Sequence, residues 1–453
     1  MVKAKTSFVC QQCSASFSKW SGRCDNCGSW NSLIEQAAEV KGVAAVYQSE
    51  GKVLDALSLS EATAQHDEHQ TRLATTIGDL DEVLGGGIVK GSVVLLAGQP
   101  GIGKSTVLSQ VAAKVGADHS VLYVSGEESV AQIAGRVKRL GINDKTISFA
   151  STTSADDIAA TLKTSKYQLV IVDSIQTIAL ASLSSAPGSV SQITNATNVL
   201  IQAAKQSSTS LIIVGHVTKE GTIAGPKVLE HLVDVVLSID GDRYAGFKVM
   251  RAIKNRYGST SEAAVFEMTD SGLVPVDNPS AALLAERQNA DGSVILATME
   301  GNRPLLVEIQ ALVSKTHFGY PKRTASGFDL NRLNVLIAVL ERRTKLALSE
   351  SDIYINVVGG IKLQDPGADL AVCMAIASAA AGRQLSDDTV VFGEVGLSGE
   401  LRSVNGTDRR TAEAKKLGFS AIIAPHTRTA KSKVQSPLLH LKDILNKYLR
   451  KVD

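Results

Sequence analysis

Residues 98–106 read GQPGIGKST, a glycine-rich stretch whose residue types suit the binding of phosphate groups. The apolar run SVVLLA precedes it and TVLSQVAAKV follows, so we expect it between a strand and a helix. Glycines let backbone N–H groups approach phosphates, and the N-terminus of the helix adds partial positive charge. Lys104 would reach the β- and γ-phosphates, while the Ser105 hydroxyl would hold Mg²⁺. The candidate nucleotide-binding residues are Gly98, Gln99, Pro100, Gly101, Ile102, Gly103, Lys104, Ser105 and Thr106.

Three further polar positions follow apolar runs and complete a predicted nucleotide site. Asp173 ends LVIVD, where a carboxylate beside the phosphate loop suits Mg²⁺ coordination, directly or through water. Glu127 and Glu128 follow VLYVS, and either could polarise an attacking water, or both could simply favour a helix N-terminus. We favour Glu127 as the catalytic residue. His216 ends a run that begins LIIVG, and it is either a γ-phosphate sensor or a hydrogen-bonded structural histidine.

Four of the five cysteines form two CxxC pairs with ten residues between them: Cys10, Cys13, Cys24 and Cys27. Each CxxC turn can present two thiolates to one metal ion, and two such turns complete a tetrahedron. Four thiolates leave no open catalytic position, so we predict a structural zinc ion. An iron–sulfur cluster or redox-active thiols are the alternatives.

The cysteine-containing segment 1–36 is too short to build an adequate apolar core, so metal binding would supply its folding energy. Phe8, Phe17, Trp20 and Trp30 are expected to form a small core around the metal. The alternative is an aromatic face for a partner or for nucleic-acid bases.

The composition indicates a globular protein of about three domains in 453 residues. Its 47 basic and 45 acidic residues give a net charge of +2, which excludes a polycation and a wholly disordered acidic chain. Local basic patches remain compatible with nucleic-acid binding. No apolar run reaches about 18 residues and no apolar segment precedes the first cysteine pair, so we expect a cytoplasmic protein without a membrane partner.

Composition divides the chain into a zinc-binding module (1–36), a linker with a short helix near 58–65 (37–70), and two α/β regions (71–275 and 276–453). Short Val-, Ile- and Leu-rich runs in the first α/β region alternate with helical patterns, which predicts a parallel sheet flanked by helices. The predicted strands are Ser92–Ala97, Val121–Ser125, Leu169–Asp173, Leu211–Gly215 and Val233–Ile239. The second region has predicted helices at Leu330–Arg342 and Asp369–Ala381, and Cys373 is expected in its core.

The cysteine pairs, the segment LGGGIVKGSVVLLAGQPGIGKST and the pentapeptide KNRYG at 254–258 together resemble the RadA (Sms) family of bacterial DNA repair proteins. The family usually has Phe where this chain has Tyr257, which keeps an aromatic ring. The resemblance covers nearly the whole chain except the linker. It implies a RecA-like, DnaB-type ATPase core that uses ATP and Mg²⁺ and assembles as a homo-hexamer. It also implies translocation on single-stranded DNA and extension of heteroduplex at branched DNA together with the RecA recombinase.

Within KNRYG, Lys254 and Arg256 alternate, so on a strand both point to one face. The resemblance makes them candidates to reach phosphates across a subunit boundary, as an arginine finger does, whereas a solvated basic strand end is the plainer interpretation. DNA contacts are expected from the polar loops 182–192 and 218–227. In the second loop, Lys219 and Lys227 would pair with phosphates.

Residues 276–453 resemble the proteolytic domain of the Lon protease through LQDPGADLAVCMAIASAAAGR and FGEVGLSGELRSV. Lon-type proteolysis needs a serine nucleophile that a lysine activates. The matched motifs place Ala368 at the serine position and Asp408 at the lysine position. We therefore expect a proteolytically inactive scaffold for oligomerisation and DNA. The alternatives for the whole chain are an ATP-regulated, non-motor assembly factor and, less favoured, a Lon-type protease.

Overall fold

The computed structural model describes residues 6–12, 15–37, 58, 71–142, 147–216, 228–241, 246–317, 319–425 and 440–449. The chain packs as two compact units, one of residues 1–238 and 253–258 and the other of residues 239–252 and 259–453. The helix predicted near 58–65 lies outside the described residues apart from Ser58. Within the described parts, no helix has the length and apolar character that crossing a membrane requires.

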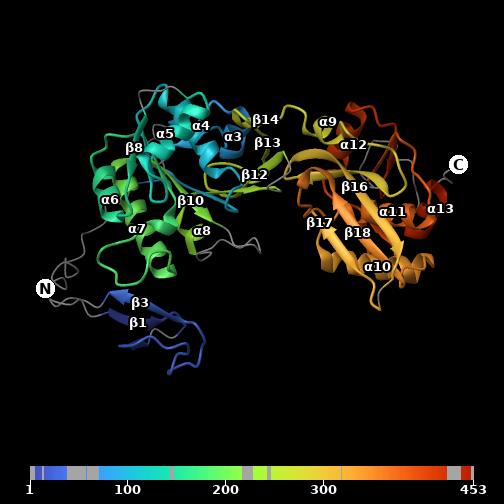
Figure 1. The fold of residues 1–453 in the computed structure, drawn as a ribbon, viewed down its shortest axis with the longest axis horizontal. Helices are drawn as coiled ribbons and strands as arrows, with labels where there is room; N and C mark the ends of the chain where they lie inside the picture. The colour runs from blue at the N-terminus through green and yellow to red at the C-terminus, as the bar shows by residue number, and fades with distance from the viewer. Residues whose placement is uncertain are drawn as a thin grey trace. The chain divides into compact units, whose positions relative to one another are not determined.

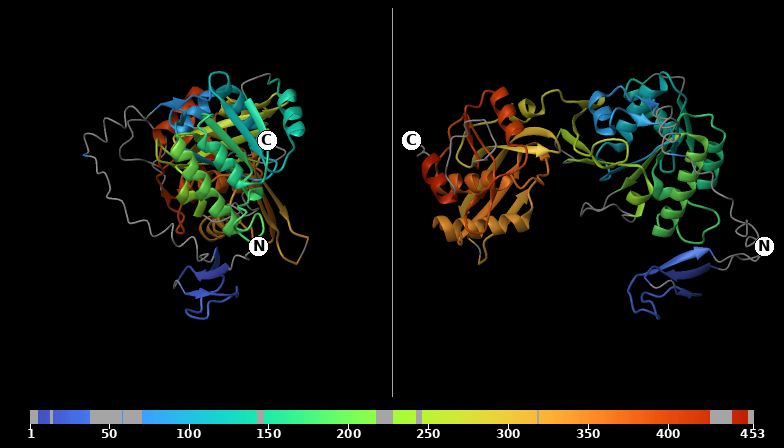
Figure 2. Two further views of the ribbon diagram at one scale, coloured as in Figure 1. Left: turned by 90° about the vertical axis from the view of Figure 1, so that its left-hand side faces the viewer. Right: turned by 180° about the vertical axis from the view of Figure 1, so that it is seen from behind.

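The N-terminal ribbon is a small antiparallel sheet of order β2-β1-β3, drawn in blue in Figure 1 and from two further sides in Figure 2. Its strands are β1 (Thr6–Cys10), β2 (Ser16–Phe17) and β3 (Leu33–Ala37). Cys10, Cys24 and Leu33 form its buried core, and Phe8 and Phe17 pack against them. Trp20 and Trp30 are 59% and 73% exposed, so the prediction that they belong to this core is wrong. The cysteines and phenylalanines already fill the space that three short strands enclose.

The sheet that carries the phosphate loop confirms the predicted parallel architecture. Its strands β6 (Val93–Gly98), β10 (Ser210–His216), β9 (Leu169–Asp173), β7 (Val121–Ser125) and β8 (Ile147–Ser151) are neighbours in this order and run parallel. Alternate side chains of these strands pack with helices α6 (Ala155–Lys163) and α7 (Val190–Ser207) in one buried cluster. Helices α4 (Lys104–Gly116) and α5 (Val130–Arg139) lie on the other face (Figure 1). The carboxyl ends of the parallel strands therefore meet at one edge.

The same sheet continues beyond β6 through β11 (Val235–Asp240), β12 (Phe247–Asn255), β13 (Ala263–Thr269) and β14 (Gly272–Pro275). β12, β13 and β14 pair antiparallel in sequence order. The smaller elements of this part of the chain are β4 (Arg72–Leu73), β5 (Ile88–Val89), α3 (Gly78–Leu84), η1 (Ile175–Thr177) and α8 (Val228–Leu232). The predicted boundary at 275/276 directly follows β14 and stays a prediction.

The second unit has a six-stranded mixed sheet of order β17-β18-β16-β15-β19-β22. These strands are β15 (Ser293–Glu300), β16 (Arg303–Lys315), β17 (Arg323–Ser326), β18 (Ser351–Val357), β19 (Thr389–Val391) and β22 (Ala421–Ile423). The remaining elements are α9 (Pro279–Leu284), α10 (Leu330–Thr344), η2 (Val358–Gly360), α11 (Ala368–Ala381), β20 (Glu394–Val395), β21 (Leu401–Arg402), α12 (Thr407–Lys416) and α13 (Leu441–Tyr448).

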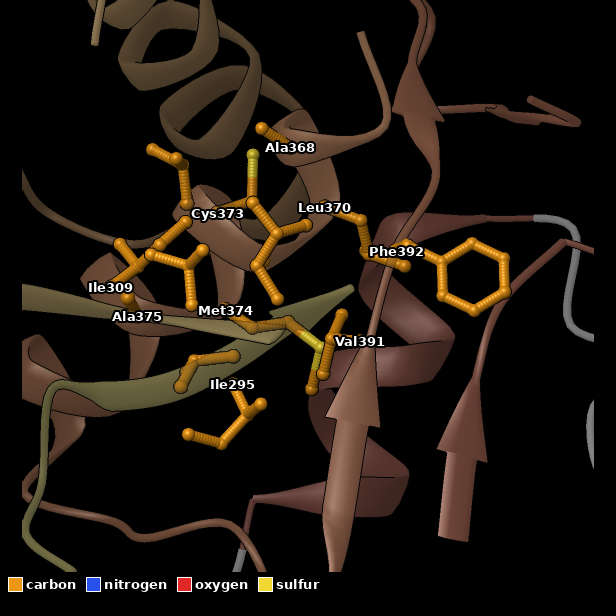
Figure 3. Close-up of a cluster of buried hydrophobic side chains, with 14 of the residues drawn as sticks. Ile295, Ile309, Ala368, Leu370, Cys373, Met374, Ala375, Val391 and Phe392 are labelled. Carbon is orange, nitrogen blue, oxygen red and sulfur yellow. The ribbon is translucent and has the colours of Figure 1, made fainter. Parts of the chain in front are cut away.

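Helix α11 is the centre of this second core. It is apolar around its whole circumference and buried from its first residue through Ser378, as a helix without a solvent face must be. Figure 3 shows its side chains Leu370, Cys373 and Met374 gathered with residues of the neighbouring strands. Burial raises the pKa of the Cys373 thiol well above its ordinary value, which agrees with its predicted place in the core. The helices predicted at 330–342 and 369–381 are confirmed as α10 and α11.

Candidate active site

The phosphate-binding loop connects β6 to α4 in the strand–loop–helix context that its sequence predicts. β6 ends at Gly98 and α4 begins at Lys104. Gly101 and Gly103 have φ angles of 79° and 112°, a region that residues with a Cβ rarely adopt. Both glycines are therefore needed for this turn, which aims backbone N–H groups and the N-terminus of α4 at one place.

Lys104 lies folded into its own loop, with only 4% of its surface exposed. Its Nζ donates to the carbonyl oxygens of Gly98 at 2.9 Å and Gln99 at 3.0 Å, and it lies 3.2 Å from His216 Nδ1. Because an ammonium group only donates, Nδ1 must accept, which leaves the proton of a neutral imidazole on Nε2. That Nε2 lies 3.4 Å from Glu127 Oε1, so His216 connects Lys104 with Glu127.

Asp173 lies at the end of β9 and is buried with 6% exposure. The Tyr123 hydroxyl on the neighbouring strand β7 donates to Asp173 Oδ2 at 2.6 Å. Burial, with the nearby Asp173 carboxylate as the second cause, raises the pKa of Tyr123 far above its ordinary value. Tyr123 thus stays protonated at neutral pH and fixes the orientation of the carboxylate that would face Mg²⁺.

Arg136, on α5, connects this carboxylate to the phosphate loop. Its Nη2 donates to the Tyr123 hydroxyl at 3.2 Å, and its Nε donates to Ser109 Oγ at 3.2 Å. Ser109 Oγ in turn donates to the carbonyl oxygen of Ser105 at 2.8 Å. One buried guanidinium therefore links α4, β7 and, through Tyr123, the end of β9. Neither Tyr123 nor Arg136 was among the residues that sequence reasoning selected.

Removing the Tyr123 hydroxyl should weaken the Mg²⁺ dependence of ATP turnover. A hydrogen bond to a charged group is worth about 1.5–3 kcal/mol, so Tyr123→Phe should lower turnover at limiting Mg²⁺ at least about tenfold. Raising the Mg²⁺ concentration should recover part of this loss, because the loosened carboxylate still binds the ion. A Mg²⁺ titration of ATP hydrolysis checks this, with Tyr167→Phe as the matched control. Identical titration curves for Tyr123→Phe and the parent chain would contradict the positioning role.

The two adjacent glutamates have different surroundings. Glu128 forms an ion pair with Arg136 Nη1, so its carboxylate is part of the Arg136 network. The Glu127 side chain is 44% exposed, lies beside His216, and accepts a hydrogen bond from Ser174 Oγ on the residue after Asp173. The structure thus brings Glu127, Lys104 and His216 together beside the end of β9.

Glu127→Gln should lower ATP turnover by about 10²-fold while ATP binding persists, because an amide cannot accept the proton of an attacking water. Glu128→Gln should cost less than tenfold, because Glu128 contacts Arg136 instead. Single-turnover hydrolysis together with a nucleotide-binding titration separates the two variants. Equal losses in both would refute the distinction between the glutamates.

Three of the predicted zinc ligands lie close enough together to bind one metal ion. The Sγ atoms of Cys10, Cys24 and Cys27 all lie within 4.8 Å of one another, and those of Cys10 and Cys27 are 3.6 Å apart. Zn–S bonds of about 2.3 Å in a tetrahedron place sulfurs about 3.8 Å apart. Burial raises the pKa of the Cys24 thiol to about 11, and a coordinated metal ion reverses this by favouring the thiolate. Cys13, the predicted fourth ligand, lies outside the described residues.

Lys254 and Arg256 lie at the edge of the sheet opposite the phosphate loop. The Arg256 guanidinium pairs with Asp234 Oδ1 at 3.1 Å, and Asp234 Oδ2 accepts from the N–H of Val93 at the start of β6. The phosphate loop begins at the other end of β6, which six residues make roughly 17 Å long. Arg256 therefore cannot reach the phosphate loop of its own chain.

Lys254 holds the C-terminal end of α8. Its Nζ donates to the carbonyl oxygens of Glu230 and Val233, each at 2.8 Å. Burial, and next the neighbouring Arg256 charge, lower the pKa of Lys254. The side chain of Lys254 is thus engaged within its own chain, whereas that of Arg256 is 52% exposed.

The two predicted DNA-contacting loops are only partly within the described residues. Lys219 and Lys227 lie outside them. In the first loop, Gln192 is 1% exposed and its amide bonds to Leu180, Leu183 and Ser185. Gln192 therefore shapes that loop from inside, which leaves the exposed residues before α7 as its available contact surface.

At the Lon-like motifs, Ala368 lies beside a largely buried Asp365–Arg410 ion pair, and Asp408 is exposed in the first turn of α12. Ala368 is 0% exposed at the start of α11. Beside it, Arg410 Nη1 donates to Asp365 Oδ2 at 2.6 Å and comes within 2.9 Å of the position that a Cβ on Gly367 would take. Burial acts to raise the pKa of Asp365, but the hydrogen bond and charge of Arg410 outweigh it and hold that pKa below its usual range.

Arg410→Ala should destabilise the second unit by about 3 kcal/mol, the low end for a broken buried ion pair, because Asp365 loses its cationic partner but keeps the hydrogen bonds from Thr298 Oγ1 and the N–H groups of Met299 and Gly367. The difference from the parent chain should shrink on acidification, since a carboxyl with a depressed folded-state pKa loses its stabilising contribution as pH falls through that pKa. Urea unfolding of the full chain at several pH values measures this effect. Arg409→Ala, which removes an exposed neighbour, is the control and should change stability by less than about 0.5 kcal/mol. A similar effect in both variants would contradict the assignment.

Comparison with known proteins matches all three parts of the chain. The family model described as AAA domain matches residues 60–222, the Rubredoxin metal binding domain matches residues 8–35, and the Subunit ChlI of Mg-chelatase matches residues 331–428. A protein of Bacillus subtilis (strain 168) named DNA repair protein RadA is 46% identical over 94% of this chain and 93% of its own length. Proteins of the same name from Aquifex aeolicus (strain VF5) and Pseudomonas aeruginosa are each 45% identical over 94% of both chains.

Proposed function

Because this chain belongs to the RadA family of DNA repair proteins, we propose that it is a DNA-dependent ATPase of recombinational repair. In this proposal it moves along single-stranded DNA and extends heteroduplex at branched intermediates together with the RecA recombinase. The observation that carries its ATPase part is the convergence of Lys104, Glu127 and His216 beside the end of β9, where Asp173 lies.

Each residue of this site has a chemical task that its surroundings suit. Lys104 exchanges its two loop carbonyls for β- and γ-phosphate oxygens when ATP binds. Ser105 and Asp173 would hold Mg²⁺ through hydroxyl and carboxylate oxygens, and the ion would supply positive charge to the phosphates. Glu127 accepts the proton of the attacking water, and His216, between Glu127 and Lys104, responds to the γ-phosphate.

The proposed assembly is a homo-hexameric ring in which ATP lies at subunit boundaries. Arg256 is exposed and distant from its own phosphate loop, so it can act on ATP only from a neighbouring subunit. Lys254 holds α8, the helix that directly follows the segment containing Lys219 and Lys227. In a ring, DNA contact by these lysines and ATP contact by Arg256 would thus be mechanically coupled through KNRYG.

A roadblock-displacement assay tests the motor. The full chain with ATP should displace streptavidin from a biotinylated single strand, and Glu127→Gln should bind the strand without displacing the block. Mass measurement with ATP and Mg²⁺ should give six chains, and branch extension should be faster with RecA than without it. ATP-controlled assembly without displacement would favour the non-motor assembly factor.

We do not propose peptidase activity. The residue at the serine position of the Lon-like motifs, Ala368, has no nucleophile and is fully buried. Asp408 cannot replace a lysine as the activating base, and the Asp365–Arg410 ion pair occupies the adjoining space.

A further inference from the structure

The chain's two tryptophans, Trp20 and Trp30, both lie exposed on the N-terminal ribbon. Tryptophan is highly buried on average in folded proteins, so exposed fractions of 59% and 73% call for a reason. The ribbon does not need either ring for its core, which the cysteines, Leu33, Phe8 and Phe17 form. The two exposed rings therefore call for an explanation other than packing within the ribbon.

The two indoles belong to one patch. A Cβ added to Gly22 would lie 3.9 Å from the Trp20 ring and 4.0 Å from the Trp30 ring, so both ring edges flank this glycine. The Arg23 guanidinium lies 5.9 Å from the centre of the Trp30 ring and is fixed by donation from Nε to the Gly28 carbonyl at 3.0 Å. We call Lys19, Trp20, Gly22, Arg23 and Trp30 the indole patch.

The chemistry of the indole patch suits nucleic-acid bases better than an apolar protein surface. Among the described ribbon residues, the tryptophans are the exposed large apolar side chains, and no exposed aliphatic side chain adjoins them. The exposed Lys19 directly precedes Trp20, the exposed Arg23 lies against the Trp30 ring, and the exposed residue after Trp30 is the polar Asn31. Flat aromatic faces beside cations are what proteins use to hold single strands, because every base has a stacking face and every nucleotide has a phosphate.

We propose that the indole patch binds single-stranded DNA, with Trp20 and Trp30 stacking on bases and Lys19 and Arg23 pairing with phosphates. This inference rests on the proposed function, because single-stranded DNA is the ligand in both. The residues of the indole patch differ from those of the phosphate loop and of loops 182–192 and 218–227. A second contact on the same strand raises the effective concentration of DNA at the first.

Intrinsic tryptophan fluorescence of the full chain reports on this patch alone, because the sequence has no other tryptophan. Adding oligothymidine without nucleotide should quench the emission and shield it from acrylamide. Trp30→Ala should weaken binding of a labelled oligothymidine at least about fivefold, the equivalent of the ~1 kcal/mol lower limit for stacking one base. Trp30→Phe should recover part of the loss. Tyr320→Ala, which removes an 88% exposed aromatic residue elsewhere, should leave binding unchanged.

Unchanged tryptophan emission at an oligothymidine concentration that saturates the chain by anisotropy would overturn the proposal. Quenching by RecA protein but not by oligothymidine would also overturn it and assign the patch to a protein partner. Circular dichroism and zinc content of each variant confirm that the ribbon is intact. Quenching does not require ATP turnover, so a failure of DNA-stimulated hydrolysis would leave this result standing, and the reverse holds equally.

Discussion

Lys104→Ala is expected to lower ATP turnover by about 10³-fold. The Lys104 side chain is buried, and two carbonyl oxygens of the phosphate loop hold its ammonium group where the β- and γ-phosphates would bind. Removing one preorganised electrostatic contact to developing charge typically costs 10²–10³-fold, and a full charge in a buried site belongs at the upper end. Steady-state phosphate release at saturating ATP measures the effect.

Lys114→Ala is the matched control, because Lys114 is an exposed lysine in the last turn of the same helix. It should leave turnover unchanged within about twofold, since its charge faces solvent. If Lys104→Ala kept a tenth or more of the parent activity while remaining folded, the nucleotide site proposed here would be wrong.

Arg256→Ala is expected to reduce turnover by about 10³-fold or more, the usual contribution of an arginine finger. The structure adds a sharper expectation, because Arg256 and the phosphate loop of the same chain lie at opposite ends of β6. Mixing Arg256→Ala with Lys104→Ala should therefore restore turnover. At boundaries in the mixed ring, an intact loop from one variant meets an intact arginine from the other.

Arg256→Ala also removes one partner of the buried Asp234, so its folding must be checked. Asp234 keeps its bond from the Val93 N–H and its contact with Lys205, which limits the loss of stability. Arg256→Lys retains the positive charge but lacks the bidentate guanidinium donor, so its ATP turnover should remain far below that of the parent chain. Failure of two folded, co-assembling variants to complement each other would contradict action across the subunit boundary.

Sequence alone predicted the parallel sheet and the phosphate loop because buried parallel strands are continuous apolar runs. The strands predicted around residues 121–125 and 169–173 agree with β7 and β9 at both ends. β8 was missed because ISFAS mixes polar and apolar residues, as suits a strand at the end of the sheet with one buried position.

Contacts between distant segments could not be predicted in this way. Arg136 lies on a helix whose last turn also holds Lys138 and Arg139, which in sequence is indistinguishable from a solvated basic face. Only packing shows that Arg136 turns inward to Tyr123 and Ser109. Likewise Glu127 and Glu128 are adjacent in sequence, and the ion pair of Glu128 with Arg136 separates their surroundings.

For the tryptophans, the sequence predicted burial that the structure does not show. Composition suggested that Trp20 and Trp30 belong to the ribbon core, because a short metal-binding segment has few other large apolar residues. The three strands of the ribbon form one sheet, and its small core consists of Cys10, Cys24 and Leu33 with Phe8 and Phe17. No second layer packs against this sheet within the described residues of the ribbon, so nothing there buries the two indoles.

The most direct test of the central claim is ATP hydrolysis by the purified full chain with and without single-stranded DNA. Saturating oligothymidine should raise turnover several-fold in the parent chain and leave Lys104→Ala and Arg256→Ala inactive. Turnover that is the same with and without DNA, at DNA concentrations that anisotropy shows to be bound, would contradict the claim that this chain is a DNA-dependent ATPase.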